Sequence, residues 1–212
     1  MNSNVKQFTY NRKDVKAGIL HFGIGNFHRA HLEYLTNLLM EHHADQRSWG
    51  ICGAMILPSD ERLYTALKNQ DGEYTLTVCG RDGKDQHWLI GSLVELYWGM
   101  NDQEAILNKI ADPNIRIITM TITEGGYNQD KHTGEFRLDD EKVRHDLEHG
   151  AHPVTVFGYV AEGLRRRRAA EAGPITILSC DNLQHNGDTA RRSFCTFIEA
   201  QDKDLYDWVK KN

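Results

Sequence analysis

One short stretch of the chain combines residue types that could hold an anionic ligand against the backbone. It is Gly23-Ile24-Gly25, which follows an apolar run and precedes an amphipathic stretch. Gly23 can take the backbone angles of a tight turn, and Gly25 lacks a Cβ, which lets a pyrophosphate approach the main chain. A helix beginning at about Asn26 would direct free N–H groups at the phosphates. This order predicts a dinucleotide loop. The alternative is an ordinary strand-to-helix turn, because His28 replaces the third glycine of G-x-G-x-x-G.

Polar residues also follow two later apolar runs, at 115–122 and 175–178. Glu124 stands in a glycine-flanked loop after the first run, where it could contact the nicotinamide side of a cofactor or relay a proton. The alternative is a surface carboxylate in a turn. Asn182 follows the second run, where its amide could donate to a carbonyl oxygen and stabilise alkoxide character. The alternative for Asn182 is a turn residue that bonds its own backbone.

Two acidic residues follow the apolar run at 49–56 and suggest which dinucleotide is bound. Asp60 or Glu61 could accept hydrogen bonds from the adenosine ribose hydroxyls, and an anion there would repel the extra phosphate of NADP. Arg62 is the only basic residue that follows immediately. The sequence therefore predicts NAD. Asp60 could equally cap the next helix, and both roles are compatible.

These residues need a scaffold that brings several strand ends together. Apolar runs alternate with stretches of helical spacing, which predicts an α/β, doubly wound, mostly parallel sheet with ligands at the carboxyl ends of its strands. A β-hairpin at 74–78 and 87–90 is expected to be inserted in the wound sheet. The remaining strands are expected at 19–22, 49–56, 115–122 and 175–178, and helices at 26–44, 60–69, 101–111, 139–149, 154–170, 188–200 and 203–210.

Composition bounds the class of protein. The 212 residues carry a net charge of −5, which argues against nucleic acid or an anionic membrane as the main partner. None of the four cysteines forms C-x-x-C, which favours a reduced, cytoplasmic location. No apolar run reaches the roughly 18 residues of a membrane span, and the polar N-terminus does not resemble a signal peptide. We expect one dinucleotide-binding domain over residues 1–212.

Histidine and arginine clusters raise further hypotheses. The eleven histidines show no familiar zinc-ligand spacing, so no metal site is expected. His28 and Arg29 are expected to pack or to bind phosphate at the glycine loop. The run from Arg165 to Arg168 is interpreted as a solvated helix C-terminus, where the helix dipole favours cations. Neither the G-x-S-x-G nucleophile motif nor the P-loop pattern occurs.

The longer string GIGNFHRAH at 23–31 resembles the opening signature of the mannitol dehydrogenase family, the polyol-specific long-chain dehydrogenases and reductases. TITEGGY at 121–127 and SCDNLQHNG at 179–187 agree with the family in content and order. The resemblance spans the chain but covers only the family's N-terminal half. It implies a Rossmann-type domain, NAD, no metal, and hydride transfer between a polyol or sugar acid and its keto form. Mannitol, arabinitol and hexonates are among the family's substrates.

The resemblance also assigns roles to individual residues. It places Asn182, in the C-D-N motif, at the active site, where it helps to hold the reacting oxygen, and it favours a site role for Glu124. The full set of expected cofactor contacts is Gly23, Ile24, Gly25, Asn26, Phe27, Arg29, Asp60, Glu61, Thr123, Glu124 and Asn182.

The resemblance implies a catalytic lysine that this chain lacks. Family members carry a helical C-terminal domain with a K-x-x-x-x-N-x-x-H motif, and no such pattern occurs here. We therefore expect the isolated chain to bind NAD(H) with little or no dehydrogenase activity, and the substrate to require the missing domain. An apolar face left exposed where that domain docks could drive self-association.

Three other functions remain open at this point. A non-catalytic NAD-binding module would share every site above except turnover. A methyltransferase that uses S-adenosylmethionine also places G-x-G after its first strand and an acid after its second. An interaction scaffold with a degenerate loop would bind no cofactor.

Overall fold

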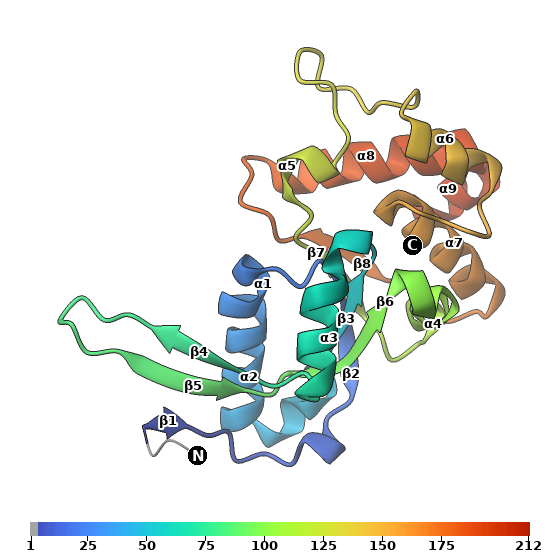
Figure 1. The fold of residues 1–212 in the computed structure, drawn as a ribbon. Helices are drawn as coiled ribbons and strands as arrows, with labels where there is room; N and C mark the ends of the chain where they lie inside the picture. The colour runs from blue at the N-terminus through green and yellow to red at the C-terminus, as the bar shows by residue number, and fades with distance from the viewer. Residues whose placement is uncertain (1–3) are drawn as a thin grey trace.

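The computed structural model describes residues 4–212, and its centre is a five-stranded parallel sheet (Figure 1). The strand order is β6-β3-β2-β7-β8, so the order reverses between β2 and β7. This is the doubly wound Rossmann arrangement, in which ligands bind beside the reversal point. The strands are β2 (Ala17–Phe22), β3 (Gly50–Met55), β6 (Leu93–Trp98), β7 (Ile117–Met120) and β8 (Thr176–Ser179).

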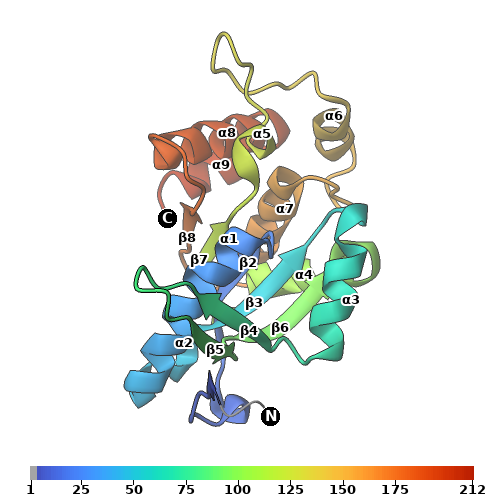
Figure 2. The same ribbon diagram turned by 60° about the vertical axis from the view of Figure 1, so that its left-hand side comes forward.

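Helices cover both faces of this sheet because side chains along each strand point alternately to opposite sides. The helices are α1 (Asn26–Ala30), α2 (Leu32–His42), α3 (Glu61–Asn69), α4 (Gly99–Ala111), α5 (Thr123–Gly126), α6 (Glu141–Glu148), α7 (Val156–Ala169), α8 (Asn186–Gln201) and α9 (Lys203–Val209). In β2, Leu20 and Phe22 join a core with α4, α7 and α8, whereas Ile19 joins a core with α2 and α3 (Figure 2). Short 3₁₀ turns occupy Arg12–Asp14, Ala44–Trp49 and Pro58–Asp60.

The predicted hairpin is present but lies outside the wound sheet. Its strands β4 (Tyr74–Val78) and β5 (Gln86–Ile90) pair antiparallel, and β5 also pairs with β1 (Val5–Lys6) in a separate three-stranded sheet (Figure 1). The edge position beside β3 is taken by β6, a strand that the sequence analysis missed. The charged residue Glu95 interrupts the apolar pattern of β6, which made the strand hard to predict. In the fold, Glu95 Oε1 lies 2.9 Å from Lys109 Nζ.

Two other expected elements differ from the structure. The single helix expected at 26–44 is broken at His31, whose backbone angles of −121° and −81° are not helical, so α1 has only five residues. The loop expected at 124–127 begins instead with the helical turn α5. Both differences lie next to the candidate site, where the backbone must turn sharply.

The arginine run at the end of α7 is only partly solvated. Arg167 is 2% exposed, which contradicts the expectation of a wholly solvated helix end. Its guanidinium fills the space between α4, α7 and the start of β8, where five backbone carbonyls point at it. It donates to the carbonyl oxygens of Ile110, Asp112, Ala172, Gly173 and Pro174 at 2.8–3.2 Å.

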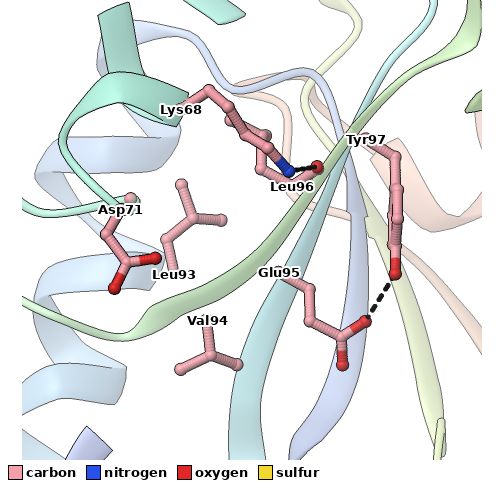
Figure 3. A pocket seen from close by; sticks show the side chains of 8 residues that line it. Lys68, Asp71, Leu93, Val94, Glu95, Leu96 and Tyr97 are labelled. Atoms are coloured by element: carbon pink, nitrogen blue, oxygen red, sulfur yellow. Dashed lines mark hydrogen bonds between the residues drawn. The ribbon is translucent and has the colours of Figure 1, made fainter. Parts of the chain in front are cut away.

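Several surface features complete the fold. A cavity of about 220 Å³ lies beside β6, where Lys68 Nζ is 3.5 Å from the carbonyl oxygen of Leu96, and it contains none of the predicted site residues (Figure 3). Phe27, Leu35 and Leu39 are exposed apolar residues on α1 and α2, and self-association through such a face stays a prediction.

Residues 4–212 contain neither a helix suited to span a membrane nor a cluster of side chains suited to bind a metal ion. No helix in this range is both long and apolar enough to cross a membrane. The same residues contain no group of three or more His, Cys, Asp or Glu side chains suited to hold a metal ion.

Candidate functional site

The two glycines of the first motif occupy different environments. Gly23 has a φ of +92°, and a Cβ there would lie 2.4 Å from the carbonyl oxygen of Thr121. Its N–H donates to the carbonyl of Ala54 at 3.0 Å, which ties the turn to β3. A Cβ on Gly25 would meet nothing within 4 Å. The fold itself therefore requires a glycine at 23, whereas only a ligand lying against the backbone would require one at 25.

The carbonyls of the turn are occupied by donors from the protein. Arg29 donates from Nη1 to the carbonyl of Ile24 at 2.7 Å and from its backbone N–H to that of Gly25 at 3.1 Å, and Nη2 donates to the Asn26 side chain. The N–H groups of the first turn of α1 have no partner within the helix. Arg29 thus stabilises the turn through its hydrogen bonds to Ile24 and Asn26. Because the expected long helix is broken, α1 has only five residues and a correspondingly small dipole. An anion at this turn would therefore depend more on hydrogen bonds from the individual N–H groups than on the helix dipole.

Beneath the turn lies a buried group formed by His21, His28 and Glu33. His28 is 1% exposed, and its Nε2 lies 2.9 Å from Glu33 Oε1. The rings of His21 and His28 stack with centroids 3.4 Å apart. The third glycine of a dinucleotide motif allows close packing of helix on strand, and here stacked rings fill that space. Of the two roles expected for His28, the structure supports packing.

Asp181 holds the backbone of the TITEGGY segment, and the sequence analysis missed this role. Its carboxylate accepts from the N–H groups of Ile122 at 3.0 Å and Thr123 at 2.9 Å and lies 2.8 Å from Tyr127 Oη. Thr123 has a φ of +66°, a backbone conformation that is uncommon for a β-branched residue. Burial raises the pKa of Tyr127, whose hydroxyl also lies 2.6 Å from Ser179 Oγ. The available signal was the carboxylate that follows the apolar run at 175–178, although β8 itself is largely exposed or half-buried.

Two cavities meet at Gly25. They share Gly25, Thr121 and Thr123, so an extended ligand that crosses Gly25 can reach both. One cavity, of about 480 Å³, contains the predicted residues Gly23, Ile24, Gly25, Asp60 and Thr123. The other, of about 410 Å³, contains Gly25, Asn26, Phe27, Thr123, Glu124 and Asn182. Arg29 and Glu61 line neither of them.

Asp60 does not cap α3 as expected, because its side chain makes no hydrogen bond to the first turn of that helix. Its Oδ2 instead accepts from the backbone N–H of Leu57 at 2.9 Å, which closes the preceding 3₁₀ turn, and the residue lines the 480 Å³ cavity. Glu61 is exposed at the start of α3. The geometry thus makes Asp60 the better placed of the two acids for a ligand in this cavity.

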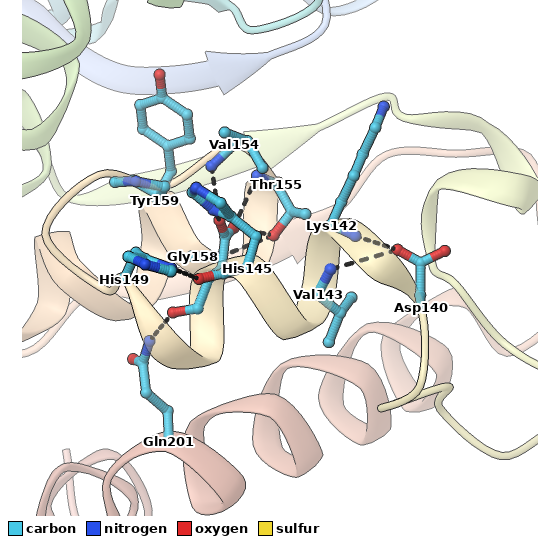
Figure 4. A network of polar contacts seen from close by, with 12 residues as sticks. Asp140, Lys142, Val143, His145, His149, Val154, Thr155, Gly158, Tyr159 and Gln201 are labelled. Atoms are coloured by element: carbon cyan, nitrogen blue, oxygen red, sulfur yellow. Dashed lines mark hydrogen bonds and ion pairs between the residues drawn. The ribbon is translucent and has the colours of Figure 1, made fainter.

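A buried carboxylate that the sequence analysis did not single out holds another segment that lines that cavity. Asp146 is fully buried and accepts from the N–H groups of Val154 and Thr155, both at 2.8 Å, and from the Thr155 hydroxyl at 2.6 Å (Figure 4). Thr155 in turn caps α7 by accepting from the N–H of Gly158 at 3.1 Å. The segment fixed in this way, 154–157, lines the same cavity as the glycine turn.

Comparison with known proteins identifies the family. The family described as the mannitol dehydrogenase Rossmann domain matches residues 17–212. The chain belongs to the mannitol dehydrogenase family. Its Rossmann fold and parallel sheet agree with that membership.

Curated and solved relatives cover nearly all of this chain. A polyol:NADP oxidoreductase from Gluconobacter oxydans is 42% identical over 99% of this chain and 43% of its own length. The Pseudomonas fluorescens mannitol 2-dehydrogenase, solved as a ternary complex with NAD and D-mannitol, gives a TM-score of 0.95 at 38% identity, covering 99% and 42%. A D-sorbitol dehydrogenase in substrate-free form gives 0.94 at 40% identity, covering 99% and 43%. The chain thus spans less than half the length of these relatives.

Proposed function

We propose that this chain binds NAD as the cofactor-binding part of a dehydrogenase that interconverts a polyol or sugar acid and its keto form. The observation that carries the proposal is the pair of cavities meeting at Gly25, at the reversal point of a mannitol dehydrogenase family fold. A relative of this family was solved with NAD and D-mannitol, which supports the same class of ligands here.

In this proposal the cofactor crosses Gly25. The pyrophosphate lies against the turn from Gly23 to Phe27, with Arg29 supporting the turn from behind, and the adenosine ribose lies near Asp60. The nicotinamide lies near Thr123 on the opposite side, in the 410 Å³ cavity.

Two polar side chains of that second cavity are proposed to face the reacting atoms. The Asn182 amide at the end of β8 holds the substrate oxygen, and Glu124 of α5 lies beside the nicotinamide or relays a proton. The base that removes the alcohol proton is supplied by polypeptide outside these 212 residues, because the lysine motif of the family does not occur in them.

A titration with NADH and NADPH tests the cofactor part of this proposal. The carboxylate of Asp60 disfavours the extra phosphate of NADPH, so we expect NADH to bind more tightly. Asp60→Asn keeps an oxygen that can accept from the Leu57 N–H but removes the charge, and the ratio of the two dissociation constants is expected to fall about tenfold, equivalent to about 1.4 kcal/mol.

Glu61→Gln is the matched control, because Glu61 is an exposed neighbour outside the cavity. Its ratio is expected to stay near that of the wild type. A preference for NADPH in the wild type would contradict the role of Asp60, and the NADP-dependent relative makes this a real alternative. Failure of both cofactors to saturate the protein would contradict the proposed function.

A second candidate function, a non-catalytic NAD-binding module, is favoured by the absence of the lysine motif. Oxidation of mannitol, arabinitol and a hexonate with NAD separates the two. We expect little or no turnover by the 212 residues alone, and turnover once the remaining part of a full-length relative is supplied. Robust oxidation by the chain alone would overturn the assignment of the base to an outside segment.

A further inference from the structure

A chain of hydrogen bonds leads from the interior of the sheet to the glycine turn. Thr119 Oγ1 lies 2.6 Å from His21 Nδ1, and His21 Nε2 lies 3.0 Å from Thr121 Oγ1. Thr121 Oγ1 in turn donates to the carbonyl oxygen of Gly23 at 2.8 Å. His21 is fully buried, and its hydrogen bond to Thr121 connects it to the turn.

The direction of every bond in this chain follows from counting hydrogens. A carbonyl oxygen only accepts, so the single hydroxyl hydrogen of Thr121 is committed to Gly23. Thr121 Oγ1 must then accept from His21, which places a hydrogen on Nε2. Burial and the neighbouring His28 hold the pKa of His21 well below its usual value, so the ring is neutral and Nδ1 accepts from Thr119. With His21 in this one tautomer, every polar side-chain atom in the series from Thr119 to Thr121 has a hydrogen-bond partner.

This series of hydrogen bonds ends at the peptide group between Gly23 and Ile24, which begins the turn. Gly23, with its φ of +92°, belongs to the residue type that rotates most freely about its backbone bonds. In a trans peptide the C=O and N–H groups point in opposite directions. Holding the Gly23 carbonyl toward Thr121 therefore fixes the N–H of Ile24 in the opposite direction and prevents this peptide from rotating.

We propose that His21 and Thr121 are positioning residues that hold the Gly23–Ile24 peptide in the orientation that receives the cofactor. This inference rests on the proposed function, since both residues of that peptide line the 480 Å³ cavity. The His28 ring is paired with Glu33 and stacks on the His21 ring, and this stacking keeps the His21 ring from turning over.

Paired variants of the two residues test this role by NADH titration. Thr121→Val removes the hydroxyl at nearly constant volume and is expected to raise the NADH dissociation constant about fivefold, the equivalent of one hydrogen bond. Thr121→Ser keeps the hydroxyl and is expected to stay within about twofold of the wild type. His21→Phe keeps a ring against His28 but donates nothing, and should weaken binding as Thr121→Val does. His21→Gln retains an amide donor and should restore much of the affinity.

Thermal melting and ring-nitrogen NMR separate positioning from simple stability. Melting temperatures identify any variant that fails to fold, and the ¹⁵N spectrum of His21 is expected to show a hydrogen on Nε2 with Nδ1 bare. Equal NADH affinity in the Val and Ser variants, or a hydrogen on Nδ1, would overturn the inference while leaving NAD binding intact. Absence of NADH binding in the wild type would instead overturn the proposed function, and the positioning role with it.

Discussion

At the scale of single residues, the candidate site depends on glycines and buried polar groups that serve different purposes. Gly23 is required by the fold, because the carbonyl of Thr121 occupies the place of a Cβ. Gly25 faces open space, so its small size serves only what binds beside it. His21 is a buried base that must remain neutral for its hydrogen bonds to persist. Each of these assignments leads to a measurable difference.

Alanine substitutions should separate the two glycines. Gly23→Ala places a Cβ 2.4 Å from backbone at a φ of +92°, and is expected to lower the free energy of unfolding by about 2 kcal/mol or more. Gly25→Ala should change it by less than about 0.5 kcal/mol but weaken NADH binding. Chemical denaturation together with NADH titration measures both. Equal stability losses in the two variants would contradict the distinction.

The buried imidazole of His21 should make stability depend on pH. Its pKa in the folded protein lies well below the unfolded value of about 6.5, so the unfolded state binds one more proton as the pH falls below that value. The contribution of His21 is therefore fully present above pH 6.5 or so and is lost below it, at up to about 1.4 kcal/mol per pH unit.

His21→Gln, which cannot titrate, is the control for this pH effect. The difference between its unfolding free energies and those of the wild type isolates His21 from the other histidines and from Glu33. Parallel stability curves for the two proteins from pH 7 to pH 5 would show that His21 titrates normally.

At the scale of elements, side chains from one element determine the path of another. Asp181, after β8, sets the backbone of the segment that follows β7, and Asp146 of α6 fixes the start of α7. Arg167 ties the ends of α4 and α7 to the start of β8 through backbone carbonyls. In each case one polar side chain, buried for Asp146 and Arg167 and half-buried for Asp181, satisfies several backbone groups of another segment.

Removal of the Arg167 guanidinium should therefore destabilise the junction of these elements. Arg167→Met keeps much of the apolar stem but removes the guanidinium donor from five carbonyls, of which, among residues 4–212, only that of Asp112 also accepts from a backbone N–H, and is expected to cost about 3 kcal/mol or more of unfolding free energy. Arg168→Met is the matched control at the neighbouring position, which is less buried, and should change stability by about 0.5 kcal/mol or less. Similar melting temperatures for the two variants would contradict the role of Arg167.

At the scale of the whole molecule, the parallel sheet collects the ends of distant segments around Gly25. The turn after β2, Asp60 after β3, α5 after β7 and Asn182 after β8 reach the two cavities from four strand ends. The hairpin sheet takes no part in this assembly, although Tyr74 Oη donates to the carbonyl of Arg29 at 2.6 Å. Stability should accordingly be concentrated in the middle of the wound sheet.

Native-state hydrogen exchange tests this distribution. The amides of β2, which is flanked on both sides by β3 and β7, should exchange on the order of 100-fold or more slowly than those of β4, all of whose residues are exposed or half-buried. Bound NADH should slow exchange further in the turn at 23–27 and in α5. Uniform protection of the hairpin and the central strands would contradict this picture.

Local patterns in the sequence were sufficient for the fold class, most elements and the glycine turn. Apolar runs and helical spacing report which residues must be buried, and glycines report where the backbone must turn, so the strands around β2, β3, β7 and β8 were predictable. The three sequence motifs also predicted the family, and the match to the family's Rossmann domain confirmed that prediction. The roles of Asp60, Glu124 and Asn182 remain predictions.

Tertiary structure alone decided which polar residues are buried and what they bind. Neither the edge strand β6, with Glu95 inside it, nor the buried state of Arg167 and Asp146 could be inferred from local pattern, because a charged residue looks solvated until its partners are known. His21 meets Thr119 and Thr121 across about a hundred residues of chain. A buried polar group is tolerated only when its hydrogen bonds are satisfied, and those partners are assembled by the packing of the sheet rather than by the neighbouring sequence.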